Sequence, residues 1–133
     1  METTDKKTIL VIEDERPLQE AIKAKLLSNE FEVVTARSVE EALNFLKDDV
    51  NISVIWLDHY LLGKETGLDF LAQIKTDDTE WQKIPIFVVS NTASPEKVQS
   101  YLRLGAKKYY TKSDYRLDQI IGDIKAFLEE GQE

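Results

Sequence analysis

The sequence contains no cysteine, which excludes disulfide bonds and metal sites built from thiolates. Positive charge is also scarce: 17 Lys and Arg residues face 25 Asp and Glu residues, and the net charge is -8. A protein that binds nucleic acid through its phosphates presents a basic face. We therefore expect no direct nucleic-acid binding. The missing cysteine fits a reducing compartment, and acidic clusters remain able to attract a metal cation.

Long apolar runs are missing as well. No run approaches the roughly 20 residues of a membrane-spanning helix, and the first residues lack the apolar core of a signal peptide. We expect a cytoplasmic protein with no membrane partner. No glycine-rich loop follows the first apolar run, which argues against a nucleotide-binding domain. The length predicts one domain over residues 1–133, with an ordered core at about 7–129 and no output domain.

Five short apolar segments alternate with helix-periodic segments along the chain. The predicted strands cover residues 8–12, 31–36, 52–57, 84–90 and 107–111. Between them, apolar residues recur three or four apart, as on one face of a helix. The first such stripe comprises Leu18, Ala21, Ile22 and Leu26. Strict strand–helix alternation predicts an α/β fold, in which a parallel sheet carries helices on both faces.

Polar residues follow four of the predicted strands. Glu13 and Asp14 come after the first strand, Asp58 after the third, Ser90 at the end of the fourth and Lys112 after the fifth. Sites in open parallel sheets form beyond the carboxyl ends of the strands. Clustered carboxylates repel one another, and oxygen ligands without His or Cys select Mg²⁺. A hydroxyl and an amine beside them suit a group that becomes more negative, such as a phosphoryl group.

This combination resembles the receiver domain of two-component response regulators over nearly the whole chain. The resemblance is carried by ILVIEDE (residues 9–15), VIWLD (54–58), IFVVS (86–90) and GAKKYYTKS (105–113), in that order. It implies a flavodoxin-like (βα)5 fold with a five-stranded parallel sheet of strand order 2-1-3-4-5. It also implies a phosphoprotein of phosphorelay signal transduction. Such a domain assists its own phosphorylation and dephosphorylation but is not classed as an enzyme.

The resemblance implies a role for each residue at that edge. Asp58 accepts a phosphoryl group from a histidine kinase or a phosphotransfer protein and becomes a phosphoaspartate. Asp14 binds Mg²⁺ directly and Glu13 binds it through a water molecule. Asp58 and the backbone carbonyl of Tyr60 complete the protein's share of the metal ligands. Lys112 pairs with the phosphoryl group.

The resemblance also implies a switch. Ser90 moves toward the phosphoryl group, and Tyr109 turns inward into the space that opens. The surface formed by the fourth helix, fifth strand and fifth helix then changes for an output protein, whose identity the sequence leaves open. The domain is expected to be a monomer or a weak dimer through that surface.

Several positions depart from the family pattern. Glu13 stands where Asp is commoner, Leu62 and Ser113 where proline is usual, and Asn91 where a small residue is usual. The loop after Asp58 is one residue longer. These departures motivate an alternative, a receiver-like interaction module that works without phosphorylation. Against it, the acceptor, metal, hydroxyl and amine positions are all filled.

Three residues near the acceptor have other interpretations. A phosphohydrolase of the haloacid dehalogenase type needs a second aspartate two residues after its nucleophile, and Tyr60 stands there instead. His59, the one histidine of the chain, is expected to be a solvent-facing loop residue. Trp56 lies within an apolar strand and is expected in the core.

Overall fold

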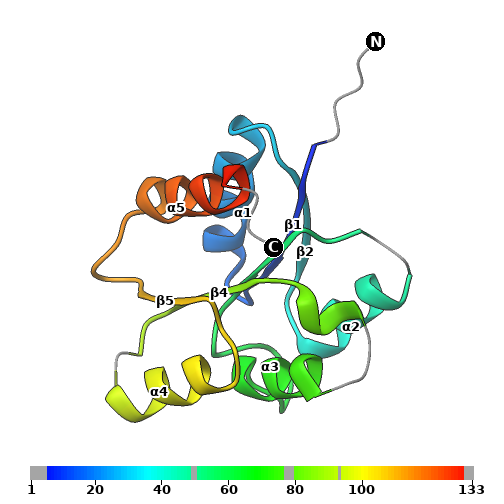
Figure 1. Ribbon diagram of the computed structural model, residues 1–133, viewed down its shortest axis with the longest axis vertical. Helices are drawn as coiled ribbons and strands as arrows, with labels where there is room; N and C mark the ends of the chain where they lie inside the picture. The colour runs from blue at the N-terminus through cyan, green and yellow to red at the C-terminus, as the bar shows by residue number, and fades with distance from the viewer. Residues whose placement is uncertain (1–5, 49–50, 77–79, 93, 131–133) are drawn as a thin grey trace.

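The computed structural model describes residues 6–48, 51–76, 80–92 and 94–130. These residues contain the strands β1 (Thr8–Ile12), β2 (Glu32–Ala36), β3 (Val54–Leu57), β4 (Ile86–Ser90) and β5 (Lys108–Thr111). All paired strands run parallel, in the order β2-β1-β3-β4-β5. Figure 1 follows the chain through these elements from the N-terminus to the C-terminus. The expected strand order is confirmed. The observed strands begin up to two residues later than predicted, and residues 1–5 and 131–133, beyond the expected core, lie outside the described residues.

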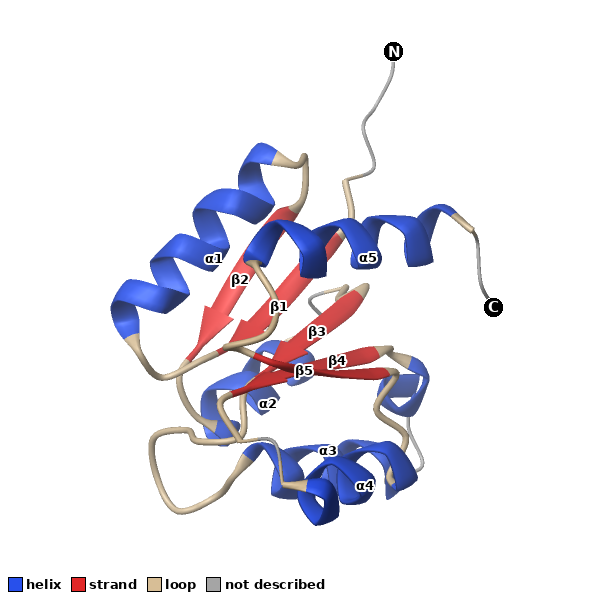
Figure 2. Ribbon diagram, turned by 90° about the vertical axis from the view of Figure 1, so that its left-hand side faces the viewer, coloured by secondary structure: helices blue, strands red, loops and turns tan. Residues whose placement is uncertain are grey.

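Helices cover both faces of the sheet, as expected. They are α1 (Arg16–Ser28), α2 (Val39–Lys47), α3 (Gly67–Thr76), α4 (Pro95–Arg103) and α5 (Leu117–Glu129), with a short 3₁₀ helix, η1 (Glu80–Lys83). Figure 2 shows α1 and α5 against one face and α2, α3 and α4 against the other. In the described part of the chain, no helix combines the length and apolar character needed to cross a membrane.

The apolar core has two parts, one on each face of the sheet. Alternate residues of a strand point to opposite faces, so Ile55 packs on the side of α2, α3 and α4, and Trp56 on the side of α1 and α5. All residues of β3 and β4 are buried. This burial on both faces explains why the central strands read as continuous apolar runs. The expected core position of Trp56 is confirmed.

Polar residues set the starts of two helices. The Ser38 hydroxyl accepts a hydrogen bond from the Glu41 amide at 3.1 Å, and α2 begins at the next residue. The Ser94 hydroxyl accepts from the Lys97 amide at 3.2 Å in front of α4. Such bonds satisfy amides that have no partner within the helix. Because α2 follows β2 and α4 follows β4, both helix starts lie near the sheet edge where the strands end.

The predicted apolar stripe of α1 is wrong at one position. Ala21 is exposed, whereas the polar Gln19 is buried. The Gln19 side-chain amide donates to the backbone carbonyls of Glu13 at 2.9 Å and Ala36 at 3.3 Å. A buried amide is tolerated where its hydrogen bonds are satisfied. Gln19 thus ties α1 to the ends of β1 and β2.

Candidate functional site

Strand register brings Glu13, Asp58 and Lys112 to one edge of the sheet. Ile12 pairs with Leu57, and the Asp58 amide donates to the Ile12 carbonyl at 3.0 Å. Glu13 and Asp58 are therefore the next residues of adjacent strands. On the other side, the Lys112 amide donates to the Ser90 carbonyl at 2.8 Å. The parallel ladder places all these residues at the carboxyl ends of the strands.

Two buried carboxylates share one ammonium group. The Lys112 Nζ lies 3.1 Å from Glu13 Oε1 and 3.2 Å from Asp58 Oδ2. Glu13 is 1% exposed and Asp58 is 4% exposed. Burial lowers the pKa of Lys112, but the carboxylates of Asp58 and Glu13 together raise it by more, so the net shift is upward. Lys112 therefore remains a cation between the two acids.

The site carries more negative charge than Lys112 neutralises. Burial, and then the charge of Asp58, raise the pKa of Glu13 to about 7, although Lys112 opposes the shift. Asp14 adds a third carboxylate, and one oxygen of each acid lies within 4.8 Å of the other two. Hard carboxylate oxygens are the ligands that Mg²⁺ and similar divalent cations prefer. The donor set and its charge therefore fit a divalent cation.

Arg37 supports this acidic cluster from the loop after β2. Its Nε and Nη2 donate to the backbone carbonyl of Asp14 at 3.0 and 2.9 Å, and its own amide donates to the Glu41 carboxylate at 2.8 Å. The guanidinium fork thus holds the backbone of one candidate metal ligand. Sequence reasoning missed Arg37 and Gln19, because neither lies in a motif and both act on backbone carbonyls distant in sequence.

The Asp58 carboxylate is held through both of its oxygens. Oδ2 faces Lys112 at 3.2 Å, and Oδ1 accepts a hydrogen bond from the His59 amide at 2.7 Å. Hydrogen bonds to a carboxylate are charge-assisted and strong. The orientation of this side chain is therefore set before any partner arrives.

His59 is buried, and the expectation that it faces solvent is wrong. The residue is 6% exposed, and its Nδ1 lies 2.6 Å from the Tyr101 hydroxyl. Its Nε2 lies 3.3 Å from the Lys97 Nζ. Burial, and then the charge of Lys97, lower the pKa of His59. Both partners come from α4, far along the chain, so the sequence near His59 contains no signal of them.

The expected switch residues, Ser90 and Tyr109, both contact Thr92. Ser90 is fully buried at the end of β4, and its hydroxyl lies 3.4 Å from the Thr92 amide that donates to it. Tyr109 is half-buried, and its hydroxyl donates to the Thr92 carbonyl at 2.6 Å. Burial raises the pKa of Tyr109. Tyr110 packs on the opposite face of the sheet, where its hydroxyl donates to Asp123 at 2.7 Å.

The loop after β3 carries the remaining candidate, Tyr60. Its side chain is exposed, and its ring packs edge-on against His59 with centroids 4.7 Å apart. The Lys97 Nζ lies 5.7 Å from the centre of the Tyr60 ring. Further along, the Leu62 amide donates to the Arg37 carbonyl at 2.9 Å, and Gly63 has a φ of +88°. The longer loop is thus tied to the β2–α2 connection.

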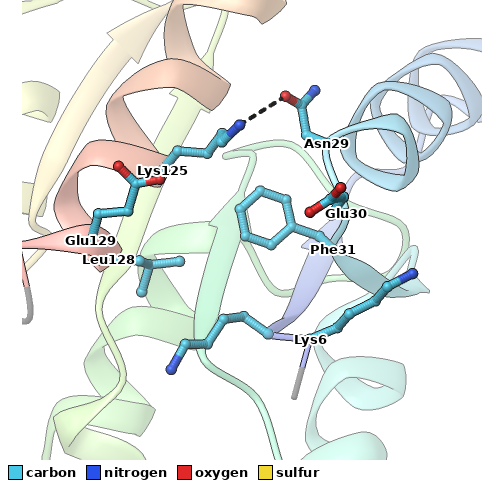
Figure 3. Close-up of a pocket in the computed structure, with 8 residues that line it drawn as sticks. Lys6, Asn29, Glu30, Phe31, Lys125, Leu128 and Glu129 are labelled. Atoms are coloured by element: carbon cyan, nitrogen blue, oxygen red, sulfur yellow. Dashed lines mark hydrogen bonds between the residues drawn. The ribbon is translucent and has the colours of Figure 1, made fainter. Parts of the chain in front are cut away.

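A separate hollow lies at the opposite end of the sheet. Its volume is about 560 Å³, and Phe31 and Leu128 contribute apolar walls (Figure 3). The Lys125 Nζ lies 3.5 Å from the Asn29 side-chain oxygen at its rim. Phe31 precedes β2, so this hollow adjoins the amino ends of the strands. It takes no part in the carboxylate site.

Comparisons with known proteins show what the chain is similar to. The sequence profile of the response regulator receiver domain matches residues 9–125. The phosphate regulon transcriptional regulatory protein PhoB of Escherichia coli strain K12 is 30% identical over 120 residues, which are 90% of this chain and 51% of PhoB. The chain therefore spans about half the length of that relative.

Solved structures show the same fold. The crystal structure of the phosphorylated cyanobacterial phytochrome response regulator RcpA superposes with a TM-score of 0.77 at 30% identity, covering 93% of this chain and 92% of RcpA. The Mn²⁺-bound form of the response regulator Rcp1 has a TM-score of 0.80 at 25% identity, covering 96% of this chain and 97% of Rcp1.

Proposed function

Because this chain belongs to the response regulator receiver domain family, we propose that it accepts a phosphoryl group on Asp58 and relays that event to a protein partner. One observation carries the proposal: the buried Asp58 carboxylate lies between the Lys112 ammonium and the His59 amide, beside Glu13 and Asp14. The phosphorylated relative RcpA supports the same chemistry. A histidine kinase or a phosphotransfer protein is the donor.

The transfer is an in-line displacement at phosphorus. A carboxylate oxygen of Asp58 forms the new P–O bond, while the P–N bond to the donor's histidine breaks and its electron pair stays on that nitrogen. Lys112, already 3.2 Å from Asp58 Oδ2, offsets negative charge on the transferred oxygens. The His59 amide keeps the attacking carboxylate oriented through Oδ1.

The acidic cluster is the proposed Mg²⁺ site. Asp14 would be a direct ligand, Glu13 would act through a water molecule, and Asp58 and the Tyr60 carbonyl would complete the set. When bound, Mg²⁺ supplies positive charge that stabilises the phosphoryl oxygens. The clustered carboxylates and the Mn²⁺-bound relative Rcp1 support a divalent cation here.

The output step uses Ser90 and Tyr109. In the proposal, the buried Ser90 hydroxyl moves toward the phosphoryl group, Tyr109 follows, and the surface made of α4, β5 and α5 changes. An output protein reads that surface, and Asp58 acts as a phosphoacceptor rather than as the centre of an enzyme. The phosphorylation-independent module is not favoured, because the charged positions are all filled and meet at one place.

Intact mass spectrometry tests the proposal. The protein is incubated with Mg²⁺ and either acetyl phosphate or phosphoramidate, a small donor with a P–N bond. We expect one phosphoryl adduct, which disappears with EDTA and in the Asp58→Ala variant. Asp114→Ala, which removes an exposed carboxylate of the β5–α5 loop, should keep the adduct. Absence of the adduct with both donors would contradict the proposal and favour the interaction module.

A further inference from the structure

The imidazole of His59 has no part in the proposed transfer, yet it lies between the acceptor and α4. The backbone amide of His59 donates to Asp58 Oδ1 at 2.7 Å. Its side chain is buried and meets the Tyr101 hydroxyl at 2.6 Å and the Lys97 Nζ at 3.3 Å. One residue therefore contacts the acceptor through its backbone and α4 through its side chain.

The hydrogen-bond roles at His59 follow from the partners. The Lys97 ammonium has only donors, so Nε2 is the acceptor of that contact. A neutral imidazole then carries its proton on Nδ1, which donates to the Tyr101 hydroxyl oxygen. The ring is thus held at both nitrogens by residues of α4, on successive turns of that helix.

The acceptor loop, the start of α3 and α4 lie in close contact around Gly67. The Gly67 amide, at the start of α3, donates to the His59 carbonyl at 2.8 Å. A methyl group added at Gly67 would collide with the backbone carbonyl oxygen of Asp58 and lie 2.8 Å from the Tyr101 hydroxyl. Tyr101 itself is fully buried. In a contact this close, a shift of the loop is transmitted to α4 rather than absorbed by a cavity.

Resting on the proposed function, we propose that His59 and Tyr101 are positioning residues that couple phosphorylation of Asp58 to the position of α4. A carboxylate accepts a strong, charge-assisted bond from the His59 amide. In the acyl phosphate, the negative charge lies on the phosphoryl oxygens, and the bond to the remaining Asp58 oxygen weakens. His59 then shifts, and Tyr101 follows through its hydroxyl.

This link is separate from the Ser90 and Tyr109 switch but ends in the same place. The rings of Tyr101 and Tyr109 are 5.5 Å apart, so α4 is reached from β3 through His59 and from β5 through Tyr109. A contact from the loop after β3 and a contact from β5 thus reach the same helix. Loss of the His59 contact should weaken the response of α4 without preventing phosphorylation.

The test uses Tyr101→Phe, which keeps the ring and removes only the hydroxyl. Amide chemical shifts of the ¹⁵N-labelled chain are recorded before and after Mg²⁺ and beryllofluoride, a phosphoryl analogue. In the wild type, amides of α4 should shift together with those of Ser90 and Lys112. In Tyr101→Phe, the Ser90 and Lys112 shifts should persist while the α4 shifts fall to about half or less. Tyr110→Phe, which removes a buried hydroxyl on the opposite face, should keep the full α4 response.

A second pair of variants removes the link from its other end. His59→Leu should reduce the α4 response as Tyr101→Phe does, and adding Tyr101→Phe to it should have little further effect. His59→Asn places an amide donor near the position of Nδ1 and should restore part of the response. Partial rescue of this kind is not expected if His59 only fills space.

The outcomes separate this inference from the proposed function. A full α4 response in Tyr101→Phe would overturn the coupling and leave phosphorylation of Asp58 intact. An equal loss of response in Tyr110→Phe would also overturn it, because a general loss of packing would then explain both variants. If the wild type shows neither a phosphoryl adduct nor beryllofluoride shifts, the proposed function itself fails.

Discussion

Lys112 is the residue on which the charge balance of the site depends. Its ammonium lies within 3.2 Å of both Glu13 and Asp58, but one ammonium faces three carboxylates there, so its compensation of their charge is incomplete. The ammonium therefore has opposite effects on phosphoryl transfer and on metal binding. It assists transfer of a negative phosphoryl group, and it competes with a metal ion for the same carboxylates.

We predict that Lys112→Met slows phosphorylation but strengthens Mg²⁺ binding. Phosphorylation by acetyl phosphate should slow by about 10²-fold, the order expected when one stabilising donor is lost from a reacting group. Mg²⁺ should bind more tightly, by roughly tenfold or about 1.4 kcal/mol, because a competing cation is gone. Time-resolved intact mass and Mg²⁺ titration calorimetry measure the two effects. Lys108→Met removes an exposed lysine of β5 and should change neither; a weaker Mg²⁺ affinity in Lys112→Met would refute the argument.

The start of α3 is built around the acceptor. Gly67 is buried beneath the Asp58 carbonyl and the Tyr101 hydroxyl, so this helix can begin there only with a residue that has no side chain. Gly122, in the middle of α5, has open space where a Cβ would lie. The two glycines thus differ in whether the structure leaves space for a side chain. The first is required by packing, whereas the second leaves room for a side chain and costs the helix conformational entropy.

We predict opposite effects of alanine at these positions. Gly67→Ala should lower the free energy of unfolding by about 2 to 3 kcal/mol, because backbone atoms must move to relieve the collision. Gly122→Ala should raise it by about 0.5 to 1 kcal/mol, since alanine favours the helix. Urea denaturation followed by circular dichroism measures both. A neutral Gly67→Ala would show that α3 can shift away from Asp58 at little cost.

The whole molecule is acidic, and among the described residues the buried carboxylates, Glu13 and Asp58, lie at one edge of the sheet. The net charge is -8, and the three acids of the cluster lie together only in the folded chain, because β1 and β3 bring them there. A cation that binds this cluster therefore binds the folded state in preference to the unfolded one. Binding of that kind stabilises the fold by mass action.

We predict that Mg²⁺ stabilises the protein by more than its ionic strength explains. At a free concentration of about 100 times its dissociation constant, Mg²⁺ should add about 2.7 kcal/mol to the free energy of unfolding. Thermal unfolding is compared with and without Mg²⁺, with NaCl added to match ionic strength. Asp14→Ala should lose most of the increment, whereas Asp118→Ala, an exposed acid of α5, should keep it. An equal increment in NaCl would argue against the site.

Much of the fold and the acidic edge could be predicted from the sequence. Alternating strands and helices indicate a parallel sheet, and such a sheet places the residues that follow its strands at one edge. Glu13, Asp14, Asp58 and Lys112 were expected together for this reason, and the structure brings them together. Their roles in phosphoryl transfer remain predictions. Gln19 was missed, because a buried glutamine whose amide bonds strand-end carbonyls resembles an exposed polar residue in a one-dimensional pattern.

Local periodicity is a property of neighbouring residues, so the sequence alone determined which side chains end each strand, whereas the strand order was implied by the resemblance to the receiver family. The contacts of His59, Arg37 and Gln19 were decided only by the tertiary structure. Each joins elements far apart in sequence, and each depends on how closely helices and loops pack, which no local pattern records. His59 illustrates the difference most clearly. Its position next to Asp58 follows from the sequence, whereas its side chain is buried because α4 brings Tyr101 and Lys97 against it.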